Sequence, residues 1–183
     1  MNAIDKILQT NSNFIKMSHA AVDKIPQWHM AVVTCMDTRL VGLLEPAMGI
    51  KRGDVKIIKT AGNVVSKGLN DVIKSLMVCV YELEVQEITV VGHYSCGMEK
   101  TTSYSLAEHM KECGIKEDII NGALPQLEDW ADNFCQPRQN VIDSVNNIKS
   151  SIYLPDNIPV HGFVIDPDTG RLDLVINGYT LDK

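Results

Sequence analysis

The sequence predicts a single α/β domain with a mostly parallel central sheet, flanking helices and a C-terminal hairpin. Three observations indicate this fold: apolar runs of strand length alternate with stretches of helical periodicity, no repeat or linker divides the chain, and its 183 residues suffice for one well-packed core. Such alternation is typical of parallel strands joined by crossover helices. We therefore expect one domain over residues 1–183.

The elements of the N-terminal half follow from local patterns. Ile4, Ile7 and Leu8 recur at helical spacing, which predicts an amphipathic helix or a pair of short helices within an N-terminal arm at residues 1–25. The continuous apolar run at 29–35 is typical of a strand that is buried on both faces. The elements expected next are a short helix at 39–48, a strand and turn at 53–63, and a long amphipathic helix at 68–85.

The C-terminal half continues the alternation. A strand at 87–98 precedes a polar helical region at 102–135 and an amphipathic helix at 137–151, which starts with proline. Residues 158–176 show a strand, an Asp-Thr-Gly turn and a return strand, which predicts an antiparallel hairpin. In parallel sheets, ligands bind beyond the carboxyl ends of the strands. We therefore expect a functional site at that edge of the sheet.

The composition argues against several classes of partner. A net charge of −6 disfavours a nucleic-acid partner held by electrostatics and a polybasic membrane anchor. No stretch approaches the ~18 apolar residues that a membrane span needs, and the N-terminus carries no signal-peptide core. We therefore expect a cytoplasmic protein whose five cysteines, an odd number, are reduced.

Polar side chains stand where two of the predicted strands end. The first strand ends in Cys35, followed by Asp37 and Arg39 at alternate positions, and a later strand delivers His93 and Cys96. Two thiolates and an imidazole are ligands that zinc favours, and a tetrahedral ion then has one position left. Each motif alone is common by chance, and a buried cysteine or a structural histidine is the alternative. Together, the two motifs predict a zinc site.

Asp37 and Arg39 are suited to assist such an ion. Side chains at alternate positions of a strand face the same way, so Cys35 and Asp37 are directed to one side. The carboxylate could accept a proton at the metal and aim the oxygen at an electrophile, or it could ligate the zinc and close the site. Arg39 can hold Asp37 through a bidentate pair, which favours the open state. A plain surface ion pair is the remaining alternative.

Four segments resemble the β-class carbonic anhydrases, particularly the small plant-type prokaryotic forms. "CMDTRL" at residue 35 is similar to their C-x-D-S/T-R strand end, "KTAGN" at residue 59 to their R/K-N-A-G-N turn, and "GHYSCGM" at residue 92 to their G-H-x-x-C-G segment. "VHGFVIDPDTGRL" near the C-terminus agrees as well. The resemblance covers roughly residues 25–176.

The resemblance implies a specific site and reaction. It implies Zn²⁺ held by Cys35, His93 and Cys96, with Asp37 and Arg39 as a catalytic dyad. It also implies reversible hydration of carbon dioxide to bicarbonate. In some members of the family, the residue that matches Asp37 becomes the fourth zinc ligand and gives an inactive form. Asp37 therefore stands here both as a catalytic residue and as a candidate ligand.

The resemblance further implies a homodimer or a larger homo-oligomer with sites near the subunit interface. We expect the arm at residues 1–25 to pack on a partner subunit. The chain departs from the usual family pattern at Lys59, Thr60 and the pair Tyr94-Ser95, which bear on the pocket wall and on substrate preference but remove no ligand.

Two alternative functions share the same residues. Relatives with this ligand set hydrolyse carbon disulfide or carbonyl sulfide, so the ligands alone do not determine the substrate. A closed zinc site of Cys35, Asp37, His93 and Cys96 could also serve stability or partner binding without catalysis. The remaining cysteines are expected to be core (Cys79) or without a metal role (Cys113 and Cys135), and we assign no role to His161.

Overall fold

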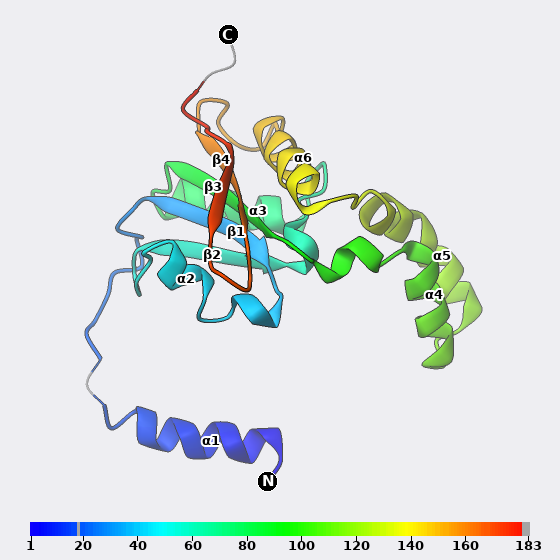
Figure 1. Ribbon diagram of the computed structural model, residues 1–183, viewed down its shortest axis with the longest axis horizontal. Coiled ribbons are helices and arrows are strands. Elements are labelled where there is room, and N and C mark those ends of the chain that lie inside the picture. The colour runs from blue at the N-terminus through cyan, green and yellow to red at the C-terminus, as the bar shows by residue number, and fades with distance from the viewer. Residues whose placement is uncertain (18, 181–183) are drawn as a thin grey trace.

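The computed structural model describes residues 1–17 and 19–180 and contains one five-stranded sheet (Figure 1). The strands are β1 (Met30–Cys35), β2 (Val55–Thr60), β3 (Glu87–His93), β4 (Val160–Ile165) and β5 (Leu172–Ile176). Their order is β2-β1-β3-β4-β5; all neighbours pair in parallel except β4 and β5, which pair antiparallel. The predicted α/β fold with a C-terminal hairpin is confirmed.

β1 and β3 form the buried centre of the sheet. Every residue of β1 from Ala31 to Cys35 is buried, as is every residue of β3 after Glu87. A strand with helices on both faces has no solvent-facing side, which explains the continuous apolar runs. Cys35 pairs with Thr60 of β2, and β1 also pairs in parallel with β3, so the three strands end at one edge.

Helices and short turns cover both faces of the sheet. The α-helices are α1 (Ala3–Phe14), α2 (Leu44–Ala47), α3 (Asp71–Glu82), α4 (Ser103–Glu112), α5 (Glu117–Leu127) and α6 (Pro137–Lys149). Three 3₁₀ turns, η1 (Thr38–Leu40), η2 (Ala61–Asn63) and η3 (Gly97–Lys100), and a π-helical turn η4 (Glu128–Asp132) connect them. One apolar core lies between the sheet and α3 and α6, and a second includes residues of α2, η1, η3 and η4.

α6 approaches the sheet closely because two strands carry glycine beneath it. A Cβ atom at Gly92 of β3 would lie 2.7 Å from Val141 Cγ2, and one at Gly162 of β4 would lie 2.7 Å from Val141 Cγ1. Val141 is fully buried at this point. The contact fixes the height of α6 above the sheet, next to the carboxyl end of β3.

Two predicted helices differ from those observed. The helix expected at 39–48 is split into η1 and α2, because Gly42 between them has φ +72°, outside the right-handed helical region. The helix expected at 68–85 starts only at Asp71, because the side chain of Asn70 caps its first turn. The backbone conformation of Gly42 decides the first boundary, and capping by Asn70 decides the second.

The N-terminal helix α1 lies apart from the sheet in Figure 1. None of its residues is buried. Within residues 1–17 and 19–180, no helix combines the length and the apolarity needed to cross a membrane.

Candidate metal centre

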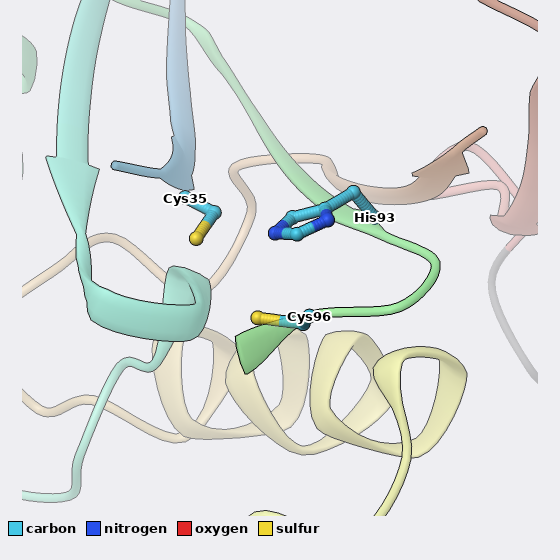
Figure 2. Close-up of side chains that lie close together, drawn as sticks. All are labelled: Cys35, His93 and Cys96. Atoms are coloured by element: carbon cyan, nitrogen blue, oxygen red, sulfur yellow. The ribbon is translucent and has the colours of Figure 1, made fainter. Parts of the chain in front are cut away.

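Three side chains converge at the carboxyl edge of the sheet (Figure 2). Cys35 ends β1, His93 ends β3, and a tight turn brings Cys96 back beneath the histidine ring. Ser95 makes this turn possible by adopting a left-handed conformation with φ +54°. The ligand atoms of the three residues all lie within 4.8 Å of one another, and all three side chains are buried. Such a cluster is small enough to surround one ion.

The hydrogen bonding of His93 suits a metal ligand. Its Nδ1 lies 3.0 Å from the Tyr94 carbonyl oxygen, an acceptor, so Nδ1 carries the proton in the neutral ring. The Nε2 lone pair then faces the two sulfur atoms, and this buried atom has no hydrogen-bond partner. A buried nitrogen without a partner is costly unless something binds it. The residues present therefore fit a cation with nitrogen and sulfur ligands.

The Cys35 and Cys96 thiols shift each other's pKa in opposite directions. The Cys96 thiol, which donates toward Cys35, outweighs the effect of burial and lowers the pKa of Cys35, and the neighbouring His93 ring acts in the same direction. The same bond, reinforced by burial, raises the pKa of Cys96. The first thiolate is thus stabilised by its neighbour, and the second forms only when positive charge compensates it. A divalent cation bound between the two thiols would supply that charge.

Asp37 and Arg39 form a bidentate ion pair beside the trio. Arg39 Nε donates to Asp37 Oδ1 at 3.0 Å, and Nη2 donates to Oδ2 at 2.8 Å. This pair lowers the pKa of Asp37 to about 2 and raises that of Arg39. Arg39 Nη2 also donates to the carbonyl oxygen of Ser95 at 2.9 Å, which ties the pair to the turn between His93 and Cys96. Asp37 is thereby restrained as an anion.

Asp37 also lies close to the unpartnered histidine nitrogen. Its Oδ2 is 3.7 Å from His93 Nε2, while Arg39 occupies both carboxylate oxygens. The Asp37 carboxylate therefore borders the space between Cys35, His93 and Cys96.

Comparison with known proteins decides the family. Residues 30–172 match the sequence profile of the family described as carbonic anhydrase, and TvaCA1, the β-carbonic anhydrase isoform I of Trichomonas vaginalis, has the same fold. The chain belongs to the β-carbonic anhydrases. The TvaCA1 structure superposes with a TM-score of 0.95 at 42% identity, covering 98% of this chain and 100% of that one.

Two other relatives extend this comparison. YvdA of Bacillus subtilis is 42% identical over 185 residues, which span 98% of this chain and 94% of that protein. A carbon disulfide hydrolase of Saccharolobus solfataricus is 28% identical over 156 residues, which span 77% of this chain and 74% of that protein. Membership of the β-carbonic anhydrases assigns the chain to an enzyme family of lyases.

The other three cysteines of this β-carbonic anhydrase are not part of the group formed by Cys35, His93 and Cys96. Cys79 is buried in the α3 core, as expected, while Cys113 and Cys135 are exposed free thiols. His161 is buried near the opposite end of the sheet, where its Nδ1 accepts a hydrogen bond from the Gly178 N–H at 3.0 Å.

Several residues around the trio were missed by sequence reasoning. Backbone N–H groups of Asp37 and Gly62 donate toward the Cys35 sulfur and contribute to lowering its pKa. A buried side chain, Asn140 of α6, holds the Gly62 carbonyl. The "KTAGN" turn indicated a glycine turn near the pocket, but no local pattern connects Asn140 with it.

Proposed function

We propose that this protein is a zinc-dependent carbonic anhydrase, which converts carbon dioxide and water reversibly to bicarbonate and a proton. The proposal depends on one observation: the buried His93 Nε2, which has no hydrogen-bond partner, faces the thiols of Cys35 and Cys96. Cys35 ends β1, and Cys96 lies in the turn that follows β3. Cys35, His93 and Cys96 would hold the ion. Zinc supplies a lowered pKa for bound water, which makes a nucleophile available near neutral pH.

Asp37 would orient the nucleophile. Its pKa of about 2 keeps it ionised throughout the neutral range, so it can accept a hydrogen bond from the attacking water and direct the oxygen lone pair toward carbon dioxide. Arg39 would keep Asp37 in place, because its two donors occupy both carboxylate oxygens. The bond to Ser95 couples this pair to the turn that carries Cys96. Asp37 is thus proposed as a catalytic residue, and Arg39 as the residue that holds it in the open state.

Stopped-flow hydration tests this function directly. Zinc-loaded protein at pH 8 to 8.5 should hydrate carbon dioxide well above the buffer rate, and the zinc content of the same sample should be close to ~1 ion per chain. A rate equal to that of buffer, with the zinc present, would contradict the proposal.

Hydrolysis of carbon disulfide is the second candidate, because a carbon disulfide hydrolase is among the relatives. Release of hydrogen sulfide from carbon disulfide or carbonyl sulfide, measured on the same zinc-loaded sample, separates the two. A non-catalytic, closed site is a third candidate, because Asp37 Oδ2 is only 3.7 Å from His93 Nε2. Metal with no exchangeable water between pH 6 and 9 would favour it, whereas the bidentate Arg39 pair favours the open site.

We also propose a homodimer or a larger homo-oligomer in which α1, the helix of the arm at 1–25, packs on a partner subunit. The helix exposes apolar side chains along its length, and a 12-residue helix without packing is marginal in water. These exposed side chains are Ile4, Ile7, Leu8 and Phe14. Light scattering should give a mass of at least two chains, and Ile7→Asp combined with Leu8→Asp should shift it toward the monomer. A monomeric wild-type protein would contradict this part.

A further inference from the structure

We propose that Asn140 is a positioning residue for the metal centre: from α6, it holds the carbonyl group of Gly62, the residue whose own N–H faces the sulfur of Cys35. This inference rests on the proposed zinc site. It concerns a side chain that touches neither metal nor substrate and acts through the backbone of the turn η2.

The contact belongs to a row of polar side chains on the buried face of α6. Asn140 Nδ2 donates to the Gly62 carbonyl oxygen at 2.7 Å. Ser144 Oγ donates to the Asn63 carbonyl oxygen at 3.2 Å. The same oxygen accepts a hydrogen bond from the Val65 backbone N–H, also at 3.2 Å. One turn further, Asn147 Nδ2 donates to a carbonyl oxygen of the same segment at 2.8 Å. α6 therefore clamps residues 62–65 through their backbone.

Gly62 requires such a restraint. It has φ +66°, and a glycine visits many backbone conformations unless its surroundings select one. Met98 and Phe134 close over it, and a Cβ atom there would lie 2.8 Å from a side-chain carbon of each. Glycine thus allows the turn to fit beneath the site, and Asn140 fixes the carbonyl side of that residue.

The turn η2 is adjacent to Cys35 in space. Thr60, which leads into η2, is the sheet partner of Cys35, and Figure 2 shows the turn next to the Cys35 and Cys96 sulfur atoms. The Gly62 N–H donates toward Cys35 and helps to lower the pKa of that thiol. Donors to a ligating thiolate orient its lone pairs and tune its charge, as outer partners of metal ligands do generally. Restraining Gly62 therefore restrains the ligand.

The same helix also supports the histidine ligand. Val141, the next residue after Asn140, packs on Gly92, which directly precedes His93. α6 thus contacts both ligand-bearing segments at one point, with an amide toward η2 and a methyl group toward β3. A side chain in this position can set the separation of Cys35 and His93.

Asn140→Ala and Asn147→Ala form a matched pair of variants. Each deletes a side-chain amide from α6 that donates to a backbone carbonyl of residues 62–65, but only Asn140 bonds the residue whose N–H faces Cys35. Zinc affinity is measured by competition with a chromophoric chelator. The thiolate-to-metal charge-transfer absorption of the cobalt-substituted protein reports ligand geometry, and thermal unfolding reports stability.

We expect Asn140→Ala to lower zinc affinity by about 10- to 100-fold and to shift the cobalt charge-transfer band. Asn147→Ala should lower the unfolding temperature while leaving affinity and band unchanged. Asn140→Ser, a smaller polar change, serves as a second variant should Asn140→Ala fold poorly, and it should move affinity and band in the same direction. If the Asn140 variants match Asn147→Ala in both metal readouts, the inference is overturned. If wild-type protein holds no zinc, the proposed function falls as well.

Discussion

The two buried histidines of the sheet, His93 and His161, have closely similar surroundings at opposite ends of neighbouring strands. His93 ends β3, whereas His161 is the second residue of β4. Each places Nε2 near a carboxylate, at 3.7 Å from Asp37 and at 3.6 Å from Glu87, and neither Nε2 has a hydrogen-bond partner. Burial and a neighbouring acid therefore do not distinguish a metal ligand from a structural histidine.

The bond at the other ring nitrogen distinguishes them. His93 Nδ1 faces a carbonyl oxygen, so it carries the proton and leaves Nε2 as a lone pair. His161 Nδ1 accepts the N–H of Gly178, so its Nε2 carries the proton and points to Glu87. In addition, two sulfur atoms lie beside His93, whereas His161 contacts the ring of Tyr179. The backbone partner of each histidine thus selects the tautomer and with it the chemistry available.

The largest expected effect comes from replacing each histidine in turn. His93→Gln should reduce bound zinc from ~1 ion per chain to a trace, because a three-ligand site loses its nitrogen ligand, and hydration should fall to the buffer rate. His161→Gln should keep the bound zinc and the hydration rate. It should lower the unfolding free energy by about 1 to 3 kcal/mol, because the buried hydrogen bond from the Gly178 N–H is lost. Elemental analysis, stopped-flow hydration and urea unfolding measure the three quantities. Loss of zinc in His161→Gln would contradict the distinction between His93 as a metal ligand and His161 as a structural histidine.

The two carboxylates provide the next contrast. Asp37→Asn keeps the size of the side chain but removes the proton acceptor, so turnover should fall by about 10²- to 10⁴-fold while zinc content stays the same. Glu87→Gln should leave turnover unchanged, because the Glu87 side chain contacts His161 and Tyr179 at the far end of the sheet. Turnover and zinc are measured on the same samples. Zinc loss in Asp37→Asn would instead identify Asp37 as mainly a ligand.

Sequence reasoning reached the parts of the molecule that local patterns determine. The buried strands β1 and β3 were predictable because strands covered on both faces are continuous apolar runs. Cys35, His93 and Cys96 could be grouped in advance because the carboxyl ends of parallel strands meet at one edge. The structure brings these three together, and the family assignment agrees with the resemblance carried by the surrounding motifs.

Other features depend on contacts between distant segments and have no local pattern. Asn140 lies 44 positions after Cys96 (140 − 96). It reaches Gly62 because the next residue, Val141, packs on two glycines of neighbouring strands and brings α6 close to the sheet. The tautomers of His93 and His161 depend on backbone groups whose direction the sequence does not reveal. The break at Gly42 in the helix predicted at 39–48 is likewise a matter of backbone conformation.

The two glycines under Val141 allow a third contrast, with a smaller effect. Gly92→Ala and Gly162→Ala each place a Cβ 2.7 Å from a Val141 methyl group, so both should lose about 1 to 3 kcal/mol of stability through overpacking. Only Gly92 adjoins His93, so only Gly92→Ala should also lower zinc affinity, by about tenfold. Denaturant unfolding and chelator competition measure the two effects. Equal zinc affinities in the two variants would show that α6 does not act on the ligand.

The smallest expected effect is a pH dependence of stability at the non-ligand end. Burial lowers the pKa of His161, although Glu87 opposes the shift. The folded state therefore binds the proton less tightly than the unfolded chain, whose histidine pKa is about 6.5. The stability that neutral His161 contributes is complete above this pH and is lost as the pH falls through it toward the lower folded value. His161→Gln should therefore flatten the fall in unfolding free energy between pH 7 and 5.5, measured by urea titration at equal zinc content. An unchanged slope in this variant would assign the pH dependence to other groups.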